Sequence, residues 1–151
     1  MSRETAVSKK EEAVSVEESI SLKIPSRAEF VLLARLMVSQ VGEFADFEHQ
    51  DVYDLKLAIT EAATNVIRHA DVDSFEIEYR VSPGAVEITV KDTGDGFEEE
   101  DFTGERSSEG GFGLAVIRSV LDEVALESSA GGGTLLRMVR RASATSNVET
   151  G

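Results

Sequence analysis

Three polar residues follow one another at intervals of four in the segment DLKLAITEAATNVIRHA. A helix places Glu61, Asn65 and His69 on one face, one turn apart. An amide oxygen such as that of Asn65 suits Mg²⁺, which takes few protein ligands in addition to phosphate oxygens. A carboxylate such as that of Glu61 can serve as a general base. The alternative is an ordinary solvated helix flank, which the row by itself favours.

A second polar group, DTGDG, comes directly after an alternating apolar run. Asp92 at the end of that run can accept hydrogen bonds from an exocyclic amine. Gly94 and Gly96 let the backbone leave a sheet sharply and let a planar ligand approach closely. The alternative is a turn rich in Asp and Gly, which is common in proteins.

A third group consists of glycines that lead into a segment with helical spacing. Gly110, Gly111 and Gly113 surround Phe112 just before Leu114. Glycines at a helix start expose backbone N–H groups and the positive end of the helix dipole, which together bind phosphate oxygens. A hinge that binds no ligand is the alternative.

Composition limits which classes of protein the chain can belong to. Its 151 residues and 16.3 kDa are the size of one compact domain. Fifteen Lys and Arg against 29 Asp and Glu give a net charge of -14, which repels nucleic acid and anionic membranes. The chain has no Cys and only 2 His, so a disulfide framework and a thiolate metal site are excluded. No apolar run is typical of a membrane span or a signal peptide, which predicts a cytoplasmic protein.

Hydrophobic spacing predicts the first half of the domain. Residues 20–24 alternate as in a half-buried strand that stops at Pro25, and Ser26 offers a cap for a helix over residues 28–41 that ends at Gly42. A second helix is predicted from about Asp51, whose carboxylate caps the first turn, to Ala70. Its predicted buried stripe consists of Leu55, Ile59, Ala62, Val66 and Ala70.

The second half is predicted to contain two pairs of strands. Residues 75–81 and 86–90 form a hairpin around Pro83 and Gly84, a long loop spans residues 93–111, and a helix spans residues 113–122. Two last strands, residues 124–128 and 134–139, flank a turn of three glycines. Residues 1–18 and 142–151 are predicted to be flexible tails around a domain of residues 19–141. The order predicts an α/β two-layer sandwich, with helices on one face of a mixed, mostly antiparallel sheet.

The order of these motifs resembles the Bergerat ATP-binding fold of histidine kinases, gyrase B and Hsp90-type ATPases. A helical Glu-x-x-x-Asn, a strand-end Asp-x-Gly-x-Gly, a long loop, a Gly-x-Gly that opens a helix, and Gly133-Thr134 on a strand follow in the order of that family. A Walker-type loop is absent, as it is there. The segments LARLMVSQV, DLKLAITEAATNVIRHA and EGGFGLAVIRSVLDEVAL are similar to those of small serine-protein kinase anti-sigma factors of bacterial stress and sporulation circuits. The resemblance covers residues 20–140.

The resemblance implies an activity and partners. Members of that family are dimers that hold a sigma factor away from RNA polymerase. With Mg²⁺ and ATP they phosphorylate a serine of an anti-anti-sigma protein of STAS fold. By position, Arg35 matches the arginine with which they contact a partner protein, and here we expect it on the exposed side of its helix.

The same resemblance implies roles for the candidate site residues. Glu61 would be the base for the incoming serine hydroxyl, Asn65 the magnesium ligand and Asp92 the residue that recognises adenine. Thr134 would line the adenine pocket and join Asp92 through water. The glycines that would line the nucleotide site are Gly94 and Gly96 near adenine, and Gly110, Gly111 and Gly113 near the phosphates.

Some features leave alternatives open. Some relatives have an arginine directly before the glycine pair, where this chain has Glu109 and its nearest loop arginine is Arg106, so the residue that contacts the γ-phosphate is not identified. His69 is interpreted as a helix-end histidine that interacts with the helix dipole, because no separate helical hairpin carries a phosphoacceptor. Two other functions remain: a non-catalytic ATP-binding anti-sigma switch module, and a detached histidine-kinase catalytic domain.

Overall fold

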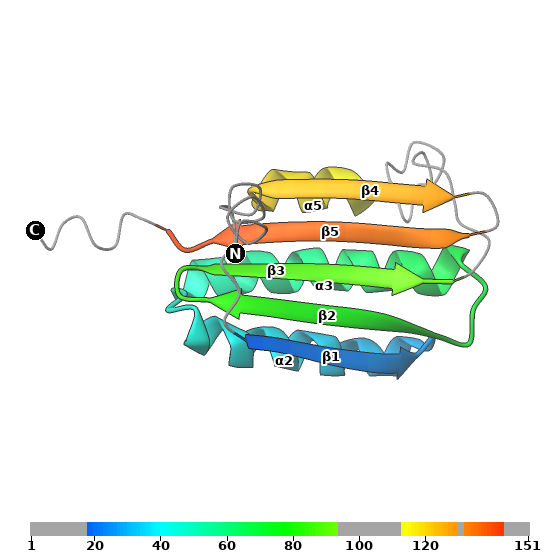
Figure 1. Ribbon diagram of the computed structural model, residues 1–151, viewed down its shortest axis with the longest axis horizontal. Helices are drawn as coiled ribbons and strands as arrows, with labels where there is room; N and C mark the ends of the chain where they lie inside the picture. The colour runs from blue at the N-terminus through cyan, green and yellow to red at the C-terminus, as the bar shows by residue number, and fades with distance from the viewer. Residues whose placement is uncertain (1–17, 94–112, 130–131, 144–151) are drawn as a thin grey trace, which may run out of the picture.

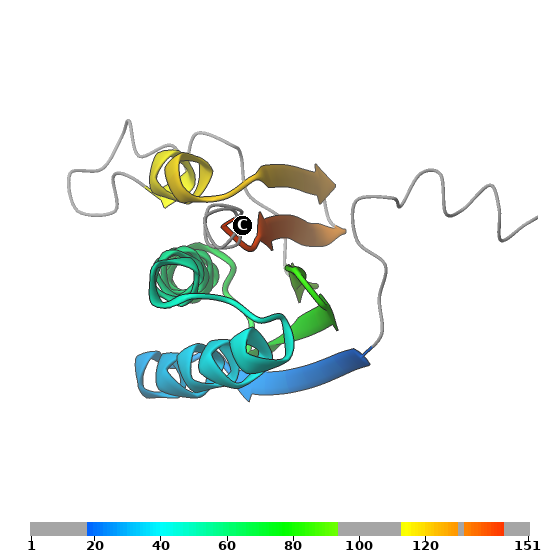
Figure 2. The same cartoon turned by 90° about the vertical axis from the view of Figure 1, so that its left-hand side faces the viewer.

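The computed structural model describes residues 18–93, 113–129 and 132–143, which form a sheet with helices on one face (Figures 1 and 2). The elements in chain order are β1 (Glu18–Pro25), a 3-10 turn η2 (Ala28–Phe30), α2 (Val31–Phe44), α3 (His49–His69), β2 (Ser74–Ser82), β3 (Ala85–Asp92), α5 (Gly113–Val120), β4 (Glu123–Ser129) and β5 (Gly133–Arg141). This order and the single helical layer confirm the predicted two-layer sandwich. Among the described residues, no helix is long and apolar enough to cross a membrane.

The sheet has five strands in the order β1-β2-β3-β5-β4. Each pair of neighbouring strands is antiparallel, so the predicted mixed sheet is antiparallel throughout the described strands. Alternate residues face the helices: Ile77 and Tyr79 of β2 and Ile88 of β3 are completely buried. The Tyr79 hydroxyl donates a 3.0 Å hydrogen bond to the carbonyl of Ala34, which fastens α2 to the sheet.

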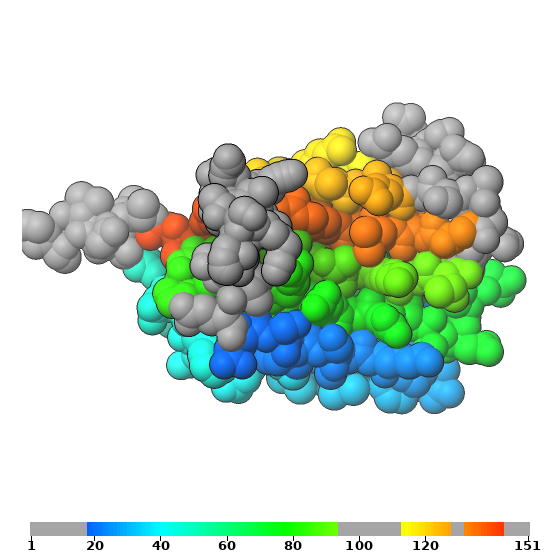
Figure 3. Space-filling view, viewed as in Figure 1, coloured from blue at the N-terminus to red at the C-terminus, as the bar shows by residue number. Residues whose placement is uncertain are grey.

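The opposite face of the sheet carries charged side chains and is the face seen in Figure 3. Arg137 of β5 lies 2.8 Å from Glu87 of β3 and 3.2 Å from Glu123 of β4. Arg141 lies 2.6 Å from the same Glu123. These ion pairs join three strands on a face that the helices do not cover.

The central helix α3 starts two residues earlier than the predicted Asp51. Glu48 is its N-cap, and the N–H of Glu48 donates to the Asp51 carboxylate at 2.9 Å in a capping box. Asp51 is therefore the third residue of the helix and not its cap. The predicted stripe is confirmed, because all five of its members are buried against the sheet: Leu55, Ile59, Ala62, Val66 and Ala70.

The first helical region differs from the prediction at both ends. Arg27 and not Ser26 is at the N-cap of η2, and no side chain caps it. The N–H of Ser26 donates instead to the carbonyl of Asp73 at 2.8 Å. The helix passes through Gly42 and ends at Phe44. A Cβ at Gly42 would lie 2.8 Å from Cγ2 of Val52, so this glycine permits close packing of α2 on α3 and does not end the helix.

Candidate functional site

Two buried polar residues face each other where β3 ends and β5 begins. Asp92 is the last residue of β3 and pairs with Thr134, the second residue of β5. They are 3% and 5% exposed. The Thr134 hydroxyl has no hydrogen-bond partner among the described residues, although buried hydroxyls are normally hydrogen-bonded. This pair therefore offers a carboxylate and a hydroxyl to a bound polar molecule.

Gly133 permits the close approach of the two strands at this point. Its φ is +92°, in the region that favours glycine. A Cβ on Gly133 would overlap the carbonyl oxygen of Asp92 and lie 3.0 Å from Cα of Thr93. The sequence predicted a glycine turn here, but it contained no signal for this contact with β3. The glycine allows Thr134 to lie directly opposite Asp92.

The second half of α3 supplies the next predicted site residues. Asn65 is 3% exposed, and its Nδ2 donates a 2.9 Å hydrogen bond to the backbone carbonyl of Glu61. This bond orients the amide and uses its nitrogen, so the oxygen is the end that can bind a cation. Glu61 is half-buried one turn earlier. His69 is the exposed last residue of the helix, as its interpretation as a helix-end residue requires.

Helix α5 begins at Gly113, which is buried, and packs on α3. Its Leu114 and Ile117 are also buried. Figure 1 shows the C-terminal end of α3, the end of β3 and the start of β5 at the same end of the molecule, and the start of α5 level with the second half of α3. The structure thus brings together the elements that carry Asn65, Asp92, Gly113 and Thr134. The remaining predicted glycines and most of the predicted long loop lie outside the described residues: Gly94, Gly96, Gly110 and Gly111.

The donors at this end can be compared with the needs of Mg²⁺. Among the described residues, no group of three or more acidic or histidine side chains forms a metal cage. The Asn65 amide instead offers one hard oxygen donor, which suits Mg²⁺ because phosphate oxygens and water can complete its shell. The donor set fits a magnesium ion that enters together with a phosphate compound.

The sequence predicted Arg35 on the exposed side of its helix, and this prediction is wrong. Arg35 is half-buried between α2 and α3, and its Nη1 donates a 2.8 Å hydrogen bond to the hydroxyl of Thr60. That hydroxyl in turn donates to the carbonyl of Lys56 at 2.7 Å. The long arginine stem reached the neighbouring helix, which the helical period of α2 alone does not predict.

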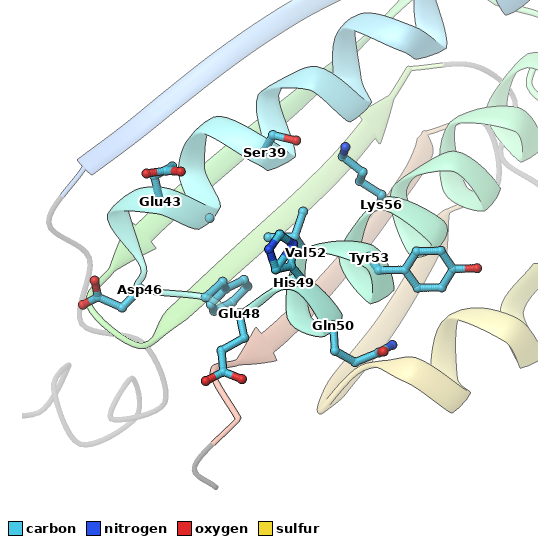
Figure 4. Close-up of a pocket in the computed structure, with 11 residues that line it drawn as sticks. Ser39, Glu43, Asp46, Glu48, His49, Gln50, Val52, Tyr53 and Lys56 are labelled. Carbon is cyan, nitrogen blue, oxygen red and sulfur yellow. The ribbon is translucent and has the colours of Figure 1, made fainter. Parts of the chain in front are cut away.

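A separate hollow of about 1020 Å³ lies between the end of α2 and the first turns of α3 (Figure 4). It is open to solvent, and none of the predicted site residues lines it. Its lining residues are Ser39, Gly42, Glu43, Asp46, Phe47, Glu48, His49, Gln50, Val52, Tyr53 and Lys56. It lies at the other end of α3 from Asn65, so it is not part of the site formed by Asp92 and Thr134.

Sequence reasoning also missed a buried ion pair. Arg140 of β5 lies 2.7 Å from Asp51 of α3, and Asp51 is completely buried. Burial alone would raise the pKa of Asp51, but hydrogen bonds from Arg140, from the N–H of Glu48 and from Ser143 lower it overall. The sequence could have indicated that Arg140 faces the helices, because it lies two residues after the inward-facing Met138 and alternate residues of a strand share a face.

The sequence of this chain is similar to those of a known protein family. Residues 24–140 match the family described as histidine kinase-like ATPase domain. The chain is 35% identical over 127 residues to the serine-protein kinase RsbW of Bacillus velezensis, with 74% of this chain and 79% of that protein covered. It is 32% identical over 133 residues to the RsbW of Staphylococcus aureus, with 78% and 84% covered.

Solved structures agree on the fold. The RsbU and RsbW domains of a Mycobacterium tuberculosis protein match with a TM-score of 0.63 and 18% identity, over 83% of this chain and 32% of that one. The histidine kinase domain of the Erythrobacter litoralis blue-light activated kinase matches with a TM-score of 0.51 and 17% identity, over 87% and 67%. The antiparallel sheet covered by helices on one face is thus the Bergerat fold that the motif order predicted.

Proposed function

The chain belongs to the histidine kinase-like ATPase family, together with the RsbW serine-protein kinases, and on this premise we propose that it transfers the γ-phosphoryl group of ATP to a serine of a partner protein. The observation that carries the proposal is the buried Asp92 opposite Thr134 at the end of the sheet. An acid and a hydroxyl at this depth suit the polar edge of a purine ring.

In this proposal the adenine ring binds at the end of β3 and β5. The Asp92 carboxylate accepts a hydrogen bond from the exocyclic amine of adenine, and the Thr134 hydroxyl completes the contact directly or through water. Gly133 supports the pocket because it lets the two strands approach closely. Gly94 and Gly96 belong to the same pocket in the proposal.

The phosphates are proposed to bind between α3 and the start of α5. In the proposal, the N–H groups around Gly110, Gly111 and Gly113 bind the phosphate oxygens, and the positive end of the α5 dipole adds to this attraction. Asn65 supplies its amide oxygen to Mg²⁺, which neutralises phosphate charge when it is bound. Backbone amides are suitable here because the chain as a whole has a net charge of -14.

Glu61 is proposed to accept the proton of the substrate serine. The serine oxygen forms a bond to the γ-phosphorus as the bond from that phosphorus to the bridging oxygen breaks, which leaves ADP. The hydroxyl proton passes to the Glu61 carboxylate, which lies one helical turn before Asn65. Positioning and charge stabilisation account for most of the catalysis of such transfers, so the protein needs few chemical groups.

The proposed partners follow from the family resemblance. We propose that the protein acts in the cytoplasm as a homodimer that sequesters a sigma factor, and that its phosphoacceptor is a STAS-domain anti-anti-sigma protein. Arg35 is the proposed partner contact. Its half-buried position against Thr60 leaves part of the side chain at the surface between α2 and α3.

Incubation with labelled ATP, Mg²⁺ and a candidate STAS protein tests the function. We expect acid-stable phosphoserine on the STAS protein, and we expect a Glu61→Gln variant to bind ATP but to transfer little phosphate. A Glu127→Gln variant on the exposed part of β4 is the matched control and should transfer normally. If the wild type binds ATP but transfers no phosphate, the kinase function is contradicted and the non-catalytic switch module is supported. Transfer to a histidine of a partner would identify a detached histidine-kinase domain.

A further inference from the structure

The buried ion pair of Arg140 belongs to a cluster at the end of the molecule opposite Asp92. The Arg140 cluster consists of Arg140, Asp51, Asp54 and Ser143. Nη2 of Arg140 lies 2.7 Å from Oδ1 of Asp51, and Nη1 lies 3.0 Å from Oδ2 of Asp54. The side chains of Arg140 and Asp54 are 15% and 13% exposed, and that of Asp51 is completely buried. One guanidinium therefore joins the end of β5 to the first turns of α3.

The same guanidinium also holds the end of α5. Nη1 of Arg140 donates a 2.7 Å hydrogen bond to the backbone carbonyl of Val120, the last residue of α5. The last carbonyls of a helix lack partners within the helix, and a cation is favourable at that end of the dipole. Helix α5 has only 8 residues, and helices this short depend on tertiary contacts to stay formed. Arg140 therefore fixes the C-terminal end of α5 against α3.

The anchor on α3 is itself held by several bonds. Besides Arg140, the Asp51 carboxylate accepts the N–H of Glu48 at 2.9 Å, and the N–H and hydroxyl of Ser143 at 3.2 and 2.7 Å. The planar fork of arginine can reach two carboxylates and a carbonyl at once, whereas the ammonium of lysine is a single point charge. The geometry thus requires an arginine at position 140 and not only a positive charge.

The two helices that Arg140 joins carry the two halves of the proposed phosphate site. Glu61 and Asn65 lie further along α3, about 15 and 20 Å from Asp51 at the rise of a helix. Helix α5 packs on α3, and Figure 1 shows the start of α5 level with the second half of α3. A shift of α5 along α3 would move Gly113 relative to Asn65.

We propose that Arg140 is a positioning residue for phosphoryl transfer, which acts by holding α5 in register with α3. This inference rests on the proposed function, because the register of α5 affects catalysis only if ATP binds between α3 and α5. Arg140 touches neither the nucleotide nor the serine in this proposal.

The experiment uses a pair of variants that separates register from stability. Arg140→Met leaves the Asp51 carboxylate buried without its cation, which is strongly destabilising. The double variant Asp51→Asn/Arg140→Met removes the fully buried charge and should regain most of the stability, because the remaining Asp54 carboxylate is partly exposed and keeps its 2.8 Å hydrogen bond from Gln50. It does not restore the bond to Val120. Arg137→Met is the matched control, because Arg137 lies on the same strand with two ion pairs on the face without helices.

Four quantities are measured on the full chain: the urea midpoint of unfolding, the Kd for Mg·ATP by calorimetry, and the kcat and KM for transfer to the STAS protein. We expect the double variant to unfold near the wild-type midpoint, with a Kd raised about threefold to tenfold and a kcat lowered about tenfold or more. Arg140→Lys should also raise the Kd, but by a smaller factor than the double variant. Arg137→Met should keep the wild-type Kd and kcat.

The inference is overturned if the double variant regains the wild-type Kd and kcat together with the wild-type midpoint. Arg140 would then have a role in stability alone. If Arg140→Met does not fold, the double variant and Arg140→Lys decide the question by the same values of Kd. Failure of the proposed function is a separate result, because it is seen in the wild type as ATP binding without transfer to a serine.

Discussion

Arg35 of α2 donates a hydrogen bond of 2.8 Å to the hydroxyl of Thr60 of α3, the residue directly before Glu61. The proposed partner contact is thus held by the helix that carries the proposed base. The bond also fixes a long side chain that would otherwise lose conformational freedom when a partner binds. A partner that contacts Arg35 would therefore meet a preorganised cation close to the proposed catalytic helix.

Arg35→Ala should weaken binding of the cognate sigma factor about 30-fold or more, as expected for a central arginine of an interface. Thr60→Val should have a smaller effect, about threefold, because it keeps the charge and removes only the tether. Titration calorimetry with the purified sigma factor measures both. Arg27→Ala is the control, because Arg27 is 63% exposed and pairs with the nearby Glu29. Equal affinities for Arg35→Ala and Arg27→Ala would remove Arg35 from the proposed interface.

Asp92→Ala should raise the Kd for Mg·ATP about 10-fold to 100-fold, which corresponds to the loss of a charge-assisted hydrogen bond of about 1.5–3 kcal/mol. Thr134→Val keeps the shape of the side chain and removes the hydroxyl, so we expect a smaller loss of about fivefold. Calorimetry with Mg·ATP gives both values. Lys91→Ala provides the comparison, because Lys91 precedes Asp92 on β3 and is exposed. Unchanged affinity after removal of the Asp92 carboxylate would rule out the proposed adenine site.

Local patterns in the sequence predicted most of the elements but little of what joins them. The stripe of α3 and the hairpin of β2 and β3 follow from periods of 3.6 and 2 with clear turn residues, and both are confirmed. The predicted C-terminal end of α2 was wrong because a glycine can either end a helix or permit close packing. At Gly42 the packing against Val52 decides, and that contact is absent from the local sequence.

Contacts between distant residues account for what the sequence did not predict. Asp51 carries the usual signal of a helix cap, and its real partner Arg140 is 89 residues away. The Asp92–Thr134 pairing depends on the register of β3 with β5, which no turn connects directly. Family resemblance assigned both residues to one site, but strand alternation alone does not select this register. The roles of Glu61, Asn65 and Asp92 remain predictions.

Gly133→Ala should destabilise the fold and weaken ATP binding together. The new Cβ would overlap the carbonyl of Asp92, so β5 must move away from β3 where the adenine site is proposed. Gly84→Ala is a matched control, because Gly84 has a similar φ of +87° but no atom within 4 Å of the added Cβ. The free energy of unfolding of Gly84→Ala should fall by only about 1 kcal/mol, the cost of placing alanine at a positive φ. Urea unfolding and ATP calorimetry on both variants test this. A Gly133→Ala protein as stable as the Gly84→Ala protein would contradict the predicted overlap.

The buried Asp51 predicts a specific pH dependence of stability. Its folded pKa lies below the ordinary value of 3.8 because of its hydrogen bonds, despite its burial, so the unfolded chain binds the proton more tightly. The contribution of Asp51 is therefore fully present above about pH 4 and is lost as the pH falls through the folded pKa. Asp51→Asn cannot titrate, so its free energy of unfolding should fall less steeply than that of the wild type between pH 5 and pH 3.

The measurement is urea unfolding of both proteins at half-unit steps across that interval, compared as the difference between them. Other carboxylates with lowered pKa, such as Glu123 beside Arg141 and Arg137, titrate in both proteins and cancel in this difference. Glu127→Gln serves as the control for the loss of one exposed charge and should run parallel to the wild type. A constant difference between the wild type and Asp51→Asn from pH 5 to pH 3 would contradict the prediction, because the Asp51 carboxylate would then have the same pKa in the folded and unfolded chain despite its four hydrogen bonds from Arg140, Glu48 and Ser143.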